Sequence, residues 1–319
     1  MRILVVGAGA TGGYFGGRMA LAGQDVTFLV REKRAEALKR SGLVIKSPKG
    51  DATLTKVQTV LADRIDAPYD LVLLSCKAYD LDNAIESFAP AVGPSTAILP
   101  LLNGMRHLDV LRERFGASSV LGGICLISAT LDANRAIVQM TDMHAIGFGE
   151  LDGRRSERVE AIAKALGAGG FDVDASETIV QQMWEKWVFL ATLAATTCLF
   201  RATIGDILNA PDGHAAIAAV FAECSAIAQA NGYPMRAPFA ERTKGMLFGA
   251  GSPLSASMMR DIENGQRTEG DHVLGDLLAR AHGASQVEGG LSVLRIAYNH
   301  VKAYEARRAR TAAAASTAS

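Results

Sequence analysis

The N-terminal segment Met1-Arg2-Ile3-Leu4-Val5-Val6-Gly7-Ala8-Gly9-Ala10-Thr11-Gly12 determines the fold of this 319-residue chain. An apolar strand leads directly into a G-x-G-x-x-G turn, a helical run follows, and a second apolar strand ends at Val30. In such a turn the first glycine permits the tight bend, the second lets backbone approach a pyrophosphate, and the third lets helix and strand pack closely. The helix N-terminus adds unpaired N–H groups and the positive end of a dipole. This context predicts a Rossmann-like domain in which residues 7–12 contact a dinucleotide cofactor.

The residue that follows the second strand is Arg31, with Lys33 and Arg34 just behind it. Folds that prefer NAD usually place Asp or Glu here, where the carboxylate accepts hydrogen bonds from the ribose 2′-OH. A guanidinium is suited instead to a 2′-phosphate, so the sequence predicts NADP(H) as the cofactor. The alternative is that Arg31 lies in solvent at the strand end and that Glu32 binds the ribose.

Two more polar residues follow apolar strands. Lys77 ends the run Asp70–Cys76, and Asn103 ends the run Thr96–Leu102. Open parallel sheets bind ligands at the carboxyl ends of their strands, so we expect Lys77 and Asn103 to contact the cofactor at the same edge as the glycine turn. The alternatives are that Lys77 is a solvated loop lysine and that Asn103-Gly104 is a plain turn.

The composition indicates a soluble protein. Thirty-three basic and thirty-three acidic residues leave no net charge, so nothing favours nucleic acid or an anionic membrane as a partner. The four cysteines form no C-x-x-C pair and have no histidine at ligand spacing, which predicts reduced thiols, a cytoplasmic location and no metal site. Residues 3–6 are too short for a signal-peptide core and residues 187–200 for a membrane span. A homodimer is compatible with the sequence, which does not decide the oligomeric state.

The hydrophobic pattern changes near Ser176 and divides the chain in two. Before this residue, strands alternate with helices, which predicts right-handed βαβ units and a parallel sheet. After it, the chain is almost entirely helical. We therefore expect an NADP-binding Rossmann-like domain at residues 1–175, an all-α domain at 176–310 and a flexible, low-complexity tail at 311–319.

Within the first domain, residues 119–126, 136–140 and 144–148 are expected to form separate strands, added to the sheet through hairpin-like turns. The helices expected in the second domain are Glu177–Phe200, Pro211–Asn231, Pro238–Leu247, Ser257–His282 and Leu291–Arg308.

Lys186 is the last charged residue before a long apolar run in the first of these helices. Its neighbours at i−3 and i+4 are Met183 and Leu190. A lysine in such surroundings is partly desolvated, which lowers its pKa towards the range useful for proton transfer. The alternative is that the side chain reaches the surface and pairs with Glu185 or Glu177.

The charge-dense segment Ser257–Asp271 is by itself typical of a solvated helix face. Together with motifs earlier in the chain, however, this segment carries a resemblance to a known family. The earlier motifs are the glycine turn, Arg31, Lys77, Asn103-Gly104 and Trp184-Glu185-Lys186, and the residues of the segment are Ser257, Asp261, Gly265, Thr268, Glu269 and Asp271. Over about residues 1–305 the chain resembles the ketopantoate reductase (2-dehydropantoate 2-reductase) family. The resemblance implies NADPH-dependent reduction of a 2-oxo acid to a 2-hydroxy acid, within pantothenate synthesis in the parent activity. It also implies catalytic roles for Lys186, Glu269 and Asn103, and a substrate-binding role for Ser257.

The chain departs from this family in the substrate site. Family asparagines four and eight residues after the lysine are replaced by Leu190 and Ala194, and one just before the serine by Leu254. The proton-transfer and cofactor residues are retained, so the departure concerns the substrate more than the reaction. We expect the 2-oxo acid to lie in a cleft between the domains and to accept its proton from Lys186. The residues expected around it are Lys186, Leu190, Ala194, Ser257 and Glu269. The alternatives are a related reductase or dehydrogenase acting on another 2-oxo or 3-hydroxy acid, and a non-catalytic NADP(H)-sensing protein.

Overall fold

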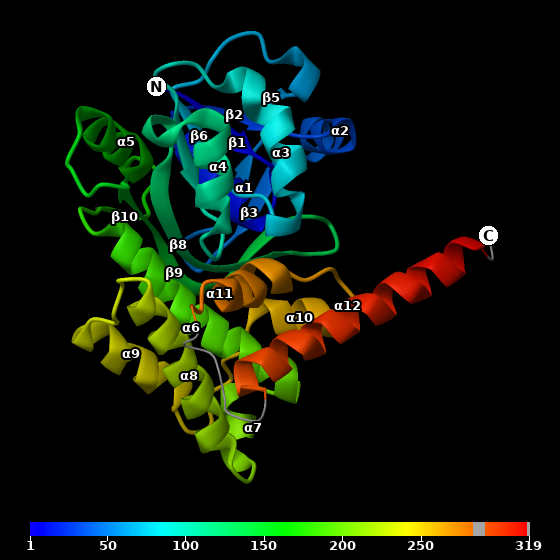
Figure 1. Cartoon of the computed structure of the whole chain (residues 1–319). Coiled ribbons are helices and arrows are strands. Elements are labelled where there is room, and N and C mark those ends of the chain that lie inside the picture. The colour runs from blue at the N-terminus through cyan, green and yellow to red at the C-terminus, as the bar shows by residue number, and fades with distance from the viewer. Residues whose placement is uncertain (283–290, 318–319) are drawn as a thin grey trace. The chain divides into compact units, whose positions relative to one another are not determined.

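A computed structural model describes residues 1–282 and 291–317 of the chain (Figure 1). The chain forms two compact units. Unit 1 consists of Met1–Leu102 and His107–Gln182, and unit 2 of Asn103–Arg106 and Met183–Ser319. The short loop that begins at Asn103 therefore belongs with the C-terminal helices, although the strand before it belongs to unit 1.

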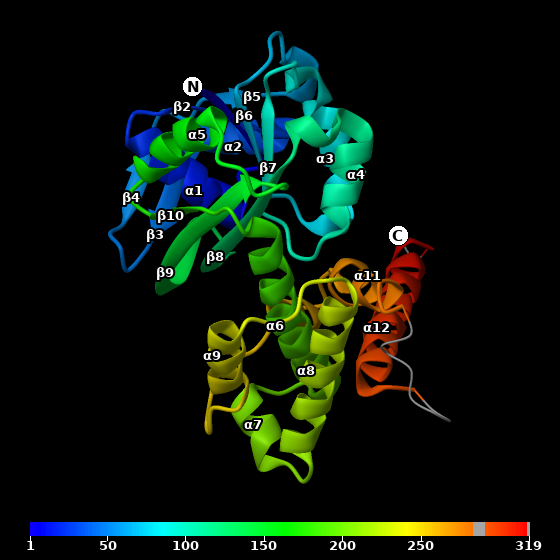
Figure 2. The same ribbon diagram turned by 60° about the vertical axis from the view of Figure 1, so that its left-hand side comes forward.

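Unit 1 contains a five-stranded, all-parallel sheet in the order β5-β2-β1-β6-β7. Its strands are β1 (Arg2–Val6), β2 (Asp25–Leu29), β5 (Thr59–Val60), β6 (Leu71–Leu74) and β7 (Ala97–Pro100). The helices that connect and follow them are α1 (Ala10–Leu21), α2 (Glu32–Ser41), α3 (Leu81–Phe88) and α4 (Arg106–Phe115). From the central strand β1 the chain passes outward to β2 on one side of the sheet, and from β6 it passes outward to β7 on the other side. Right-handed crossovers therefore place α1 on one face and α3 with α4 on the other (Figure 2).

A second sheet in unit 1 differs from the prediction. Its order is β10-β9-β3-β4, with β8 also paired to β9. The strands are β3 (Leu43–Lys46), β4 (Ala52–Leu54), β8 (Leu121–Leu131), β9 (Ile137–Glu150) and β10 (Asp172–Ala175), and α5 (Glu157–Gly167) precedes the last of them. Residues 119–148 were expected to form three short strands on the first sheet, which is wrong. The polar residues 141–142 resemble a turn, but β8 pairs with β9 on both sides of them, so β9 continues as one strand.

Helix α1 lies between the two sheets, which explains its many glycines. It contacts β1 and β2 on one side and β3, β8 and β9 on the other. A Cβ atom on Gly16 would lie 2.8 Å from the Phe28 ring, and one on Gly17 would lie 2.8 Å from Leu43 Cδ2. Small residues on both sides of α1 are therefore required for this three-layer packing.

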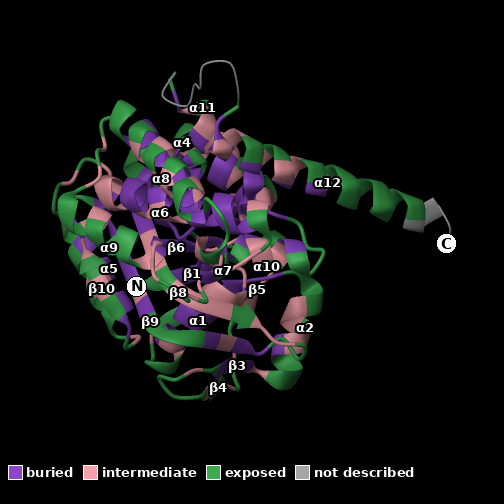
Figure 3. Cartoon of the chain, turned by 90° about the horizontal axis from the view of Figure 1, so that it is seen from below, coloured by how far each residue is buried: buried purple, intermediate pink, exposed green. Residues whose placement is uncertain are grey.

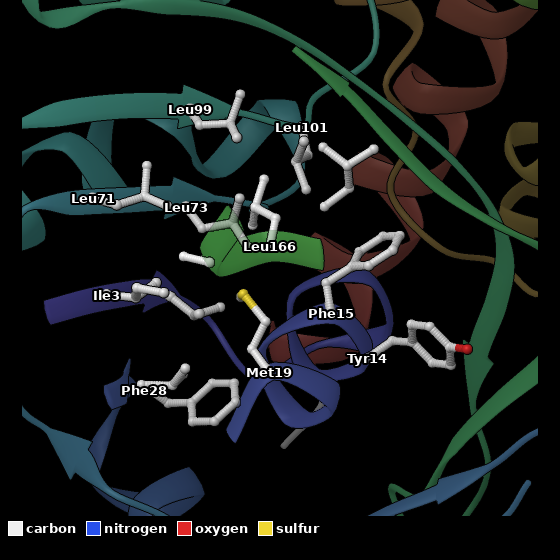
Figure 4. Close-up of a cluster of buried hydrophobic side chains, with 14 of the residues drawn as sticks. Ile3, Tyr14, Phe15, Met19, Phe28, Leu71, Leu73, Leu99, Leu101 and Leu166 are labelled. Atoms are coloured by element: carbon white, nitrogen blue, oxygen red, sulfur yellow. The ribbon is translucent and has the colours of Figure 1, made fainter. Parts of the chain in front are cut away.

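The hydrophobic core of unit 1 is centred on α1 and the first sheet. Buried residues concentrate on the strands of the first sheet, whereas residues 306–314 of the last helix are exposed (Figure 3). Ile3, Phe15, Phe28 and Leu71 are completely buried, and their side chains converge in the cluster drawn in Figure 4. Each buried aliphatic or aromatic side chain contributes about 1.5–3 kcal/mol. This core fixes the strand ends from which the candidate site is built.

Unit 2 is helical, as predicted. Its helices are α6 (Ile179–Phe200), α7 (Ile204–Asn209), α8 (Gly213–Ala230), α9 (Ala237–Leu247), α10 (Ser257–Glu263), a π-helical segment (Asp271–Gly275), α11 (Asp276–Ala279) and α12 (Val293–Thr317). Helix α8 contacts α7, α11 and α12. Among the described helices, none combines the length and the apolar character that a membrane span requires.

Two helix predictions in unit 2 were wrong in extent. The helix expected at 257–282 stops at Glu263, because Gly265 adopts a left-handed backbone (φ +67°) and the chain runs non-helically through Glu269. The last helix continues through Thr317, although residues 311–317 were expected to be frayed. Alanine has the highest helix propensity, so the low-complexity, alanine-rich end extends the helix. Residues 283–290, which separate the helices expected at 257–282 and 291–308, lie outside the described part.

Candidate functional site

The glycine turn has the geometry that a dinucleotide requires. Gly7 adopts φ +90° and donates its N–H to Leu29 O at 2.9 Å, which ties the turn to β2. A Cβ atom on Gly12 would lie 2.1 Å from Ser75 Oγ, so only glycine lets α1 start this close to β6. The space next to Gly9 is open, since a Cβ there would meet nothing within 4 Å. The turn thus offers an accessible backbone and a helix N-terminus, which fit a pyrophosphate.

Arg31 and Arg34 lie at the carboxyl end of β2. Arg31 is the N-cap residue of α2 and is exposed, and its Nη2 donates to Asn83 Oδ1 of α3 at 3.2 Å. Arg34 lies one turn into α2, and its Nη2 donates to Ala8 O, inside the glycine turn, at 3.1 Å. The prediction emphasised Arg31. The spacing of three residues, which puts Arg31 and Arg34 on one helix face, was the signal that could have singled out Arg34.

Lys77 lies three residues beyond the end of β6 and is the N-cap residue of a short 3-10 turn (Ala78–Asp80). Because β6 is the neighbour of β1 in the parallel sheet, Lys77 lies at the same sheet edge as the glycine turn. Residues Gly7–Gly12, Arg31 and Lys77 are therefore brought together within unit 1, as the regular placement after strand ends predicted.

The Asn103-Gly104 loop is fixed against two helical segments of unit 2. Gly104 has φ +81°, and a Cβ atom on it would lie 2.7 Å from His272 O and 3.8 Å from Trp187 Nε1. The Trp187 indole in turn donates to Val273 O at 2.9 Å. These contacts hold the loop, α6 and the π-helical segment together, so Asn103, Lys186 and Glu269 each lie within a few residues of one meeting point.

Lys186 is partly buried on α6, and among residues 1–282 and 291–317 it has no hydrogen-bond or ion-pair partner. Both acids considered as partners bind arginines instead. Glu177 lies 3.8 Å from Arg155, and the buried Glu185 carboxylate accepts two hydrogen bonds from the Arg236 guanidinium, at 2.8 and 2.6 Å. The Lys186 ammonium is thus available to a ligand.

The other predicted substrate residues of α6 follow Lys186 at helical spacing. Leu190 is partly buried and Ala194 is 3% exposed. Positions i, i+4 and i+8 share roughly one face of a helix. Apolar side chains therefore continue the face that carries the lysine.

Glu269 is 8% exposed and is held from both sides by α12. Its predecessor Thr268 donates its hydroxyl to Glu305, and Asp271 accepts hydrogen bonds from Tyr298 at 2.7 Å and from Lys302 at 2.9 Å. Burial opposes ionisation of Asp271, but these two hydrogen bonds outweigh it and hold its pKa below the ordinary value. The π-helical segment that begins at Asp271 is of a kind frequent at functional sites. The sequence signal for this support was weak, because its partners lie more than 25 residues away.

His272, within the π-helical segment, was not among the predicted residues. Burial and the positive charge of Arg106 lower its pKa, against an opposing effect of Glu269. The histidine is therefore neutral at physiological pH and adds no charge next to Glu269.

Ser257 is placed further from Lys186 than the other residues. It is exposed at the start of α10, and the preceding Ala256 N–H donates to Thr197 Oγ1 at 3.3 Å. Thr197 lies three turns beyond Lys186 on α6, which corresponds to roughly 16 Å along the axis.

Comparison with known proteins identifies the family. Residues 3–153 match the family described as "Ketopantoate reductase PanE/ApbA", and residues 178–305 match "Ketopantoate reductase PanE/ApbA C terminal". The chain belongs to the ketopantoate reductase family. The resemblance inferred from the motifs is thereby confirmed, and the chain is an oxidoreductase of this family.

Individual relatives support this assignment over nearly the whole chain. "Uncharacterized oxidoreductase YkpB" of Bacillus subtilis (strain 168) is 37% identical over 308 residues, covering 97% of this chain and 100% of that protein. The crystal structure of 2-dehydropantoate 2-reductase from Methylococcus capsulatus is 27% identical with a TM-score of 0.83, covering 97% of this chain and 98% of its own. The ternary structure of D-mandelate dehydrogenase with NADH and anilino(oxo)acetate also has a TM-score of 0.83, covering 97% and 99%, but at 19% identity it shows the fold alone.

Proposed function

We propose that this ketopantoate reductase family member reduces a 2-oxo acid to the 2-hydroxy acid with NADPH. The observation that carries the proposal is the partly buried Lys186 ammonium, which has no partner among the described residues. Lys186 precedes Trp187, whose indole contacts both the Asn103-Gly104 loop and the π-helical segment just after Glu269. A structural lysine in such a helix would be expected to pair with an acid, as Lys302 does.

The residues divide the reaction between a cofactor site and a substrate site. NADPH, when bound, supplies a hydride to the carbonyl carbon of the substrate. Negative charge then develops on the carbonyl oxygen, where the Lys186 ammonium stabilises it and donates a proton. Asn103 orients the substrate or the nicotinamide, while Glu269 and Ser257 bind substrate hydroxyl or carboxylate groups. Arg31 recognises the 2′-phosphate, and Lys77 and the glycine turn bind the remaining phosphates.

The α6 face also bears on which 2-oxo acid is preferred. Leu190 and Ala194 cannot pair with a polar substituent, and burying such a group unpaired costs about 1–3 kcal/mol. We therefore infer that a 2-oxo acid with an apolar tail suits this site better than ketopantoate, which carries a free hydroxyl.

The test is NADPH oxidation against a panel of 2-oxo acids, ketopantoate and branched apolar acids included, repeated with NADH. We expect turnover with at least one acid and a higher kcat/KM with NADPH. Lys186→Ala should still bind NADPH but lose turnover by ~10²–10⁴-fold, the usual contribution of general acid catalysis.

The control for this substitution is Lys244→Ala, which removes an exposed lysine of unit 2 that pairs with Glu241. It should retain wild-type kcat. Near-normal kcat in Lys186→Ala would show that Lys186 is a structural helix residue, and absence of turnover with every acid would contradict the reductase assignment.

A further inference from the structure

Arg34 is better placed than Arg31 to reach a group bound at the junction of the glycine turn and α2. Its guanidinium hydrogen bonds to Ala8 O of the turn at 3.1 Å, whereas that of Arg31 is directed to Asn83 on α3. In dinucleotide folds the ribose 2′ position lies at this junction. The pyrophosphate lies instead on the N-terminus of α1, next to Gly9.

The charge of Arg34 is not neutralised by the protein. Among the described residues it forms no ion pair, and its buried Nε has no hydrogen-bond partner. Burial and the positive charge of Arg135 lower its pKa, so two guanidinium groups repel each other here. An anion between them would relieve this repulsion.

Arg135 comes from a different element, the turn between β8 and β9. The start of β9 lies on the first turn of α1, since a Cβ atom on Gly13 would be 2.6 Å from Ile137 Cδ1. The turn before it is fixed by Asp132, whose Oδ1 accepts the N–H groups of Asn134 at 3.0 Å and Ala136 at 2.9 Å. Arg135 is thereby held near the glycine turn and exposed to solvent.

The backbone at Arg135 is a second sign of function. Its φ is +63°, a left-handed conformation that glycine adopts without steric cost and that other residues rarely adopt. Residues in such conformations concentrate at ligand-binding sites. An arginine in this conformation carries a steric cost that glycine would not. Binding of an anion by its guanidinium would offset that cost.

We propose that Arg34 and Arg135 form the binding site for the 2′-phosphate of NADPH, with Arg31 completing it from the α3 side. The ligand class is a phosphomonoester on the adenosine ribose. This inference rests on the proposed NADPH preference and assigns it to Arg34 of α2 and to Arg135 of the turn between β8 and β9.

The test uses calorimetric titration of the whole protein with two fragments, adenosine 2′,5′-bisphosphate and adenosine 5′-monophosphate. The fragments differ only in the 2′-phosphate, so the ratio of their Kd values reports that group without turnover. Wild type should bind the bisphosphate more tightly. Arg34→Met and Arg135→Gly should each weaken bisphosphate binding roughly tenfold, as expected for one charge-assisted hydrogen bond, and leave the monophosphate within a factor of two.

Arg135→Gly guards against loss of folding as an explanation, because glycine relieves the left-handed backbone and the variant should melt at or above the wild-type temperature. Lys39→Met, which removes an exposed cation of the same helix α2, is the matched control and should keep the wild-type ratio. An unchanged ratio in both arginine variants overturns this proposal while leaving NADPH preference intact. A wild type that does not discriminate between the fragments overturns both.

Discussion

Glu185 and Lys186 are adjacent residues of α6 with opposite surroundings. The Glu185 carboxylate is completely buried and bound by Arg236, whereas the Lys186 ammonium is partly exposed. Successive residues on a helix differ in direction by about 100°. One side chain can therefore fix the helix to α9 while the next is left for substrate.

Leu190 and Ala194 provide a prediction at this same scale. Leu190→Asn with Ala194→Asn should raise kcat/KM for ketopantoate relative to a branched apolar 2-oxo acid, because the new amides can pair with the substrate hydroxyl. A gain of about 1–2 kcal/mol, or roughly five- to thirtyfold in the ratio, is the scale of one hydrogen bond. Steady-state kinetics with both acids measures it.

The single variant Leu190→Asn is the control for folding, because it leaves unchanged Ala194, which is only 3% exposed and where an asparagine would strain the packing. Melting temperatures identify a misfolded variant. If the wild type already prefers ketopantoate strongly, or if the ratio stays constant in every folded variant, these residues do not line the substrate pocket.

At the scale of elements, α6 is held to α9 by the Glu185–Arg236 pair, which includes a third hydrogen bond from the Arg236 backbone N–H at 3.0 Å. Trp184 stacks on Tyr233 with ring centroids 5.6 Å apart, just before α9 begins. The helix that carries Lys186 is therefore fixed by polar and aromatic contacts at the two residues that precede the lysine.

Arg236→Met should destabilise the protein substantially, because it leaves a buried carboxylate without its bidentate partner. Removing one member of a buried pair costs about 3–5 kcal/mol, and the partial exposure of Arg236 places the expected loss near 3 kcal/mol. Chemical denaturation measures it. Lys244→Met, which breaks an exposed pair on the same helix, should cost less than about 1 kcal/mol. Equal losses in the two variants would show that Glu185 gains nothing special from Arg236.

The elements also show what the sequence could and could not determine. The position of the glycine turn, Arg31 and Lys77 at one sheet edge could be predicted because each follows an apolar strand, and parallel strand ends share one edge. The second sheet was missed because β9 pairs with β3, which lies far away in sequence, and strand pattern alone does not identify the partner. The break between α10 and the π-helical segment was missed because its causes, Gly265 and the contacts of Thr268 and Asp271 with α12, are a local backbone conformation and a tertiary interaction.

At the scale of the whole molecule, each unit has its own anchor for its functional residues. In unit 1 the buried Glu150, at the end of β9, accepts hydrogen bonds from Arg158 Nε at 2.7 Å and Nη2 at 2.6 Å, and from Ser156 at 2.6 Å. These contacts join the second sheet to α5. Because β9 also packs on α1, acid-induced loss of this pair should loosen the layer that supports the glycine turn.

The pKa of Glu150 gives this expectation a sign. Burial opposes its ionisation, but the hydrogen bonds from Arg158 and Ser156 outweigh burial and hold the pKa below its ordinary value. A carboxyl whose folded pKa is lowered stabilises the fold above the unfolded value of about 4.3, and this contribution is lost as pH falls through the folded pKa.

Glu150→Gln should therefore cost about 1–3 kcal/mol at neutral pH. Denaturation at a series of pH values should show the difference from wild type shrinking below about pH 4. Glu160→Gln, which changes an exposed partner of Arg155, should differ little from wild type at any pH. A deficit in Glu150→Gln that does not change with pH would mean that its cost comes from packing rather than from the charge of the ion pair.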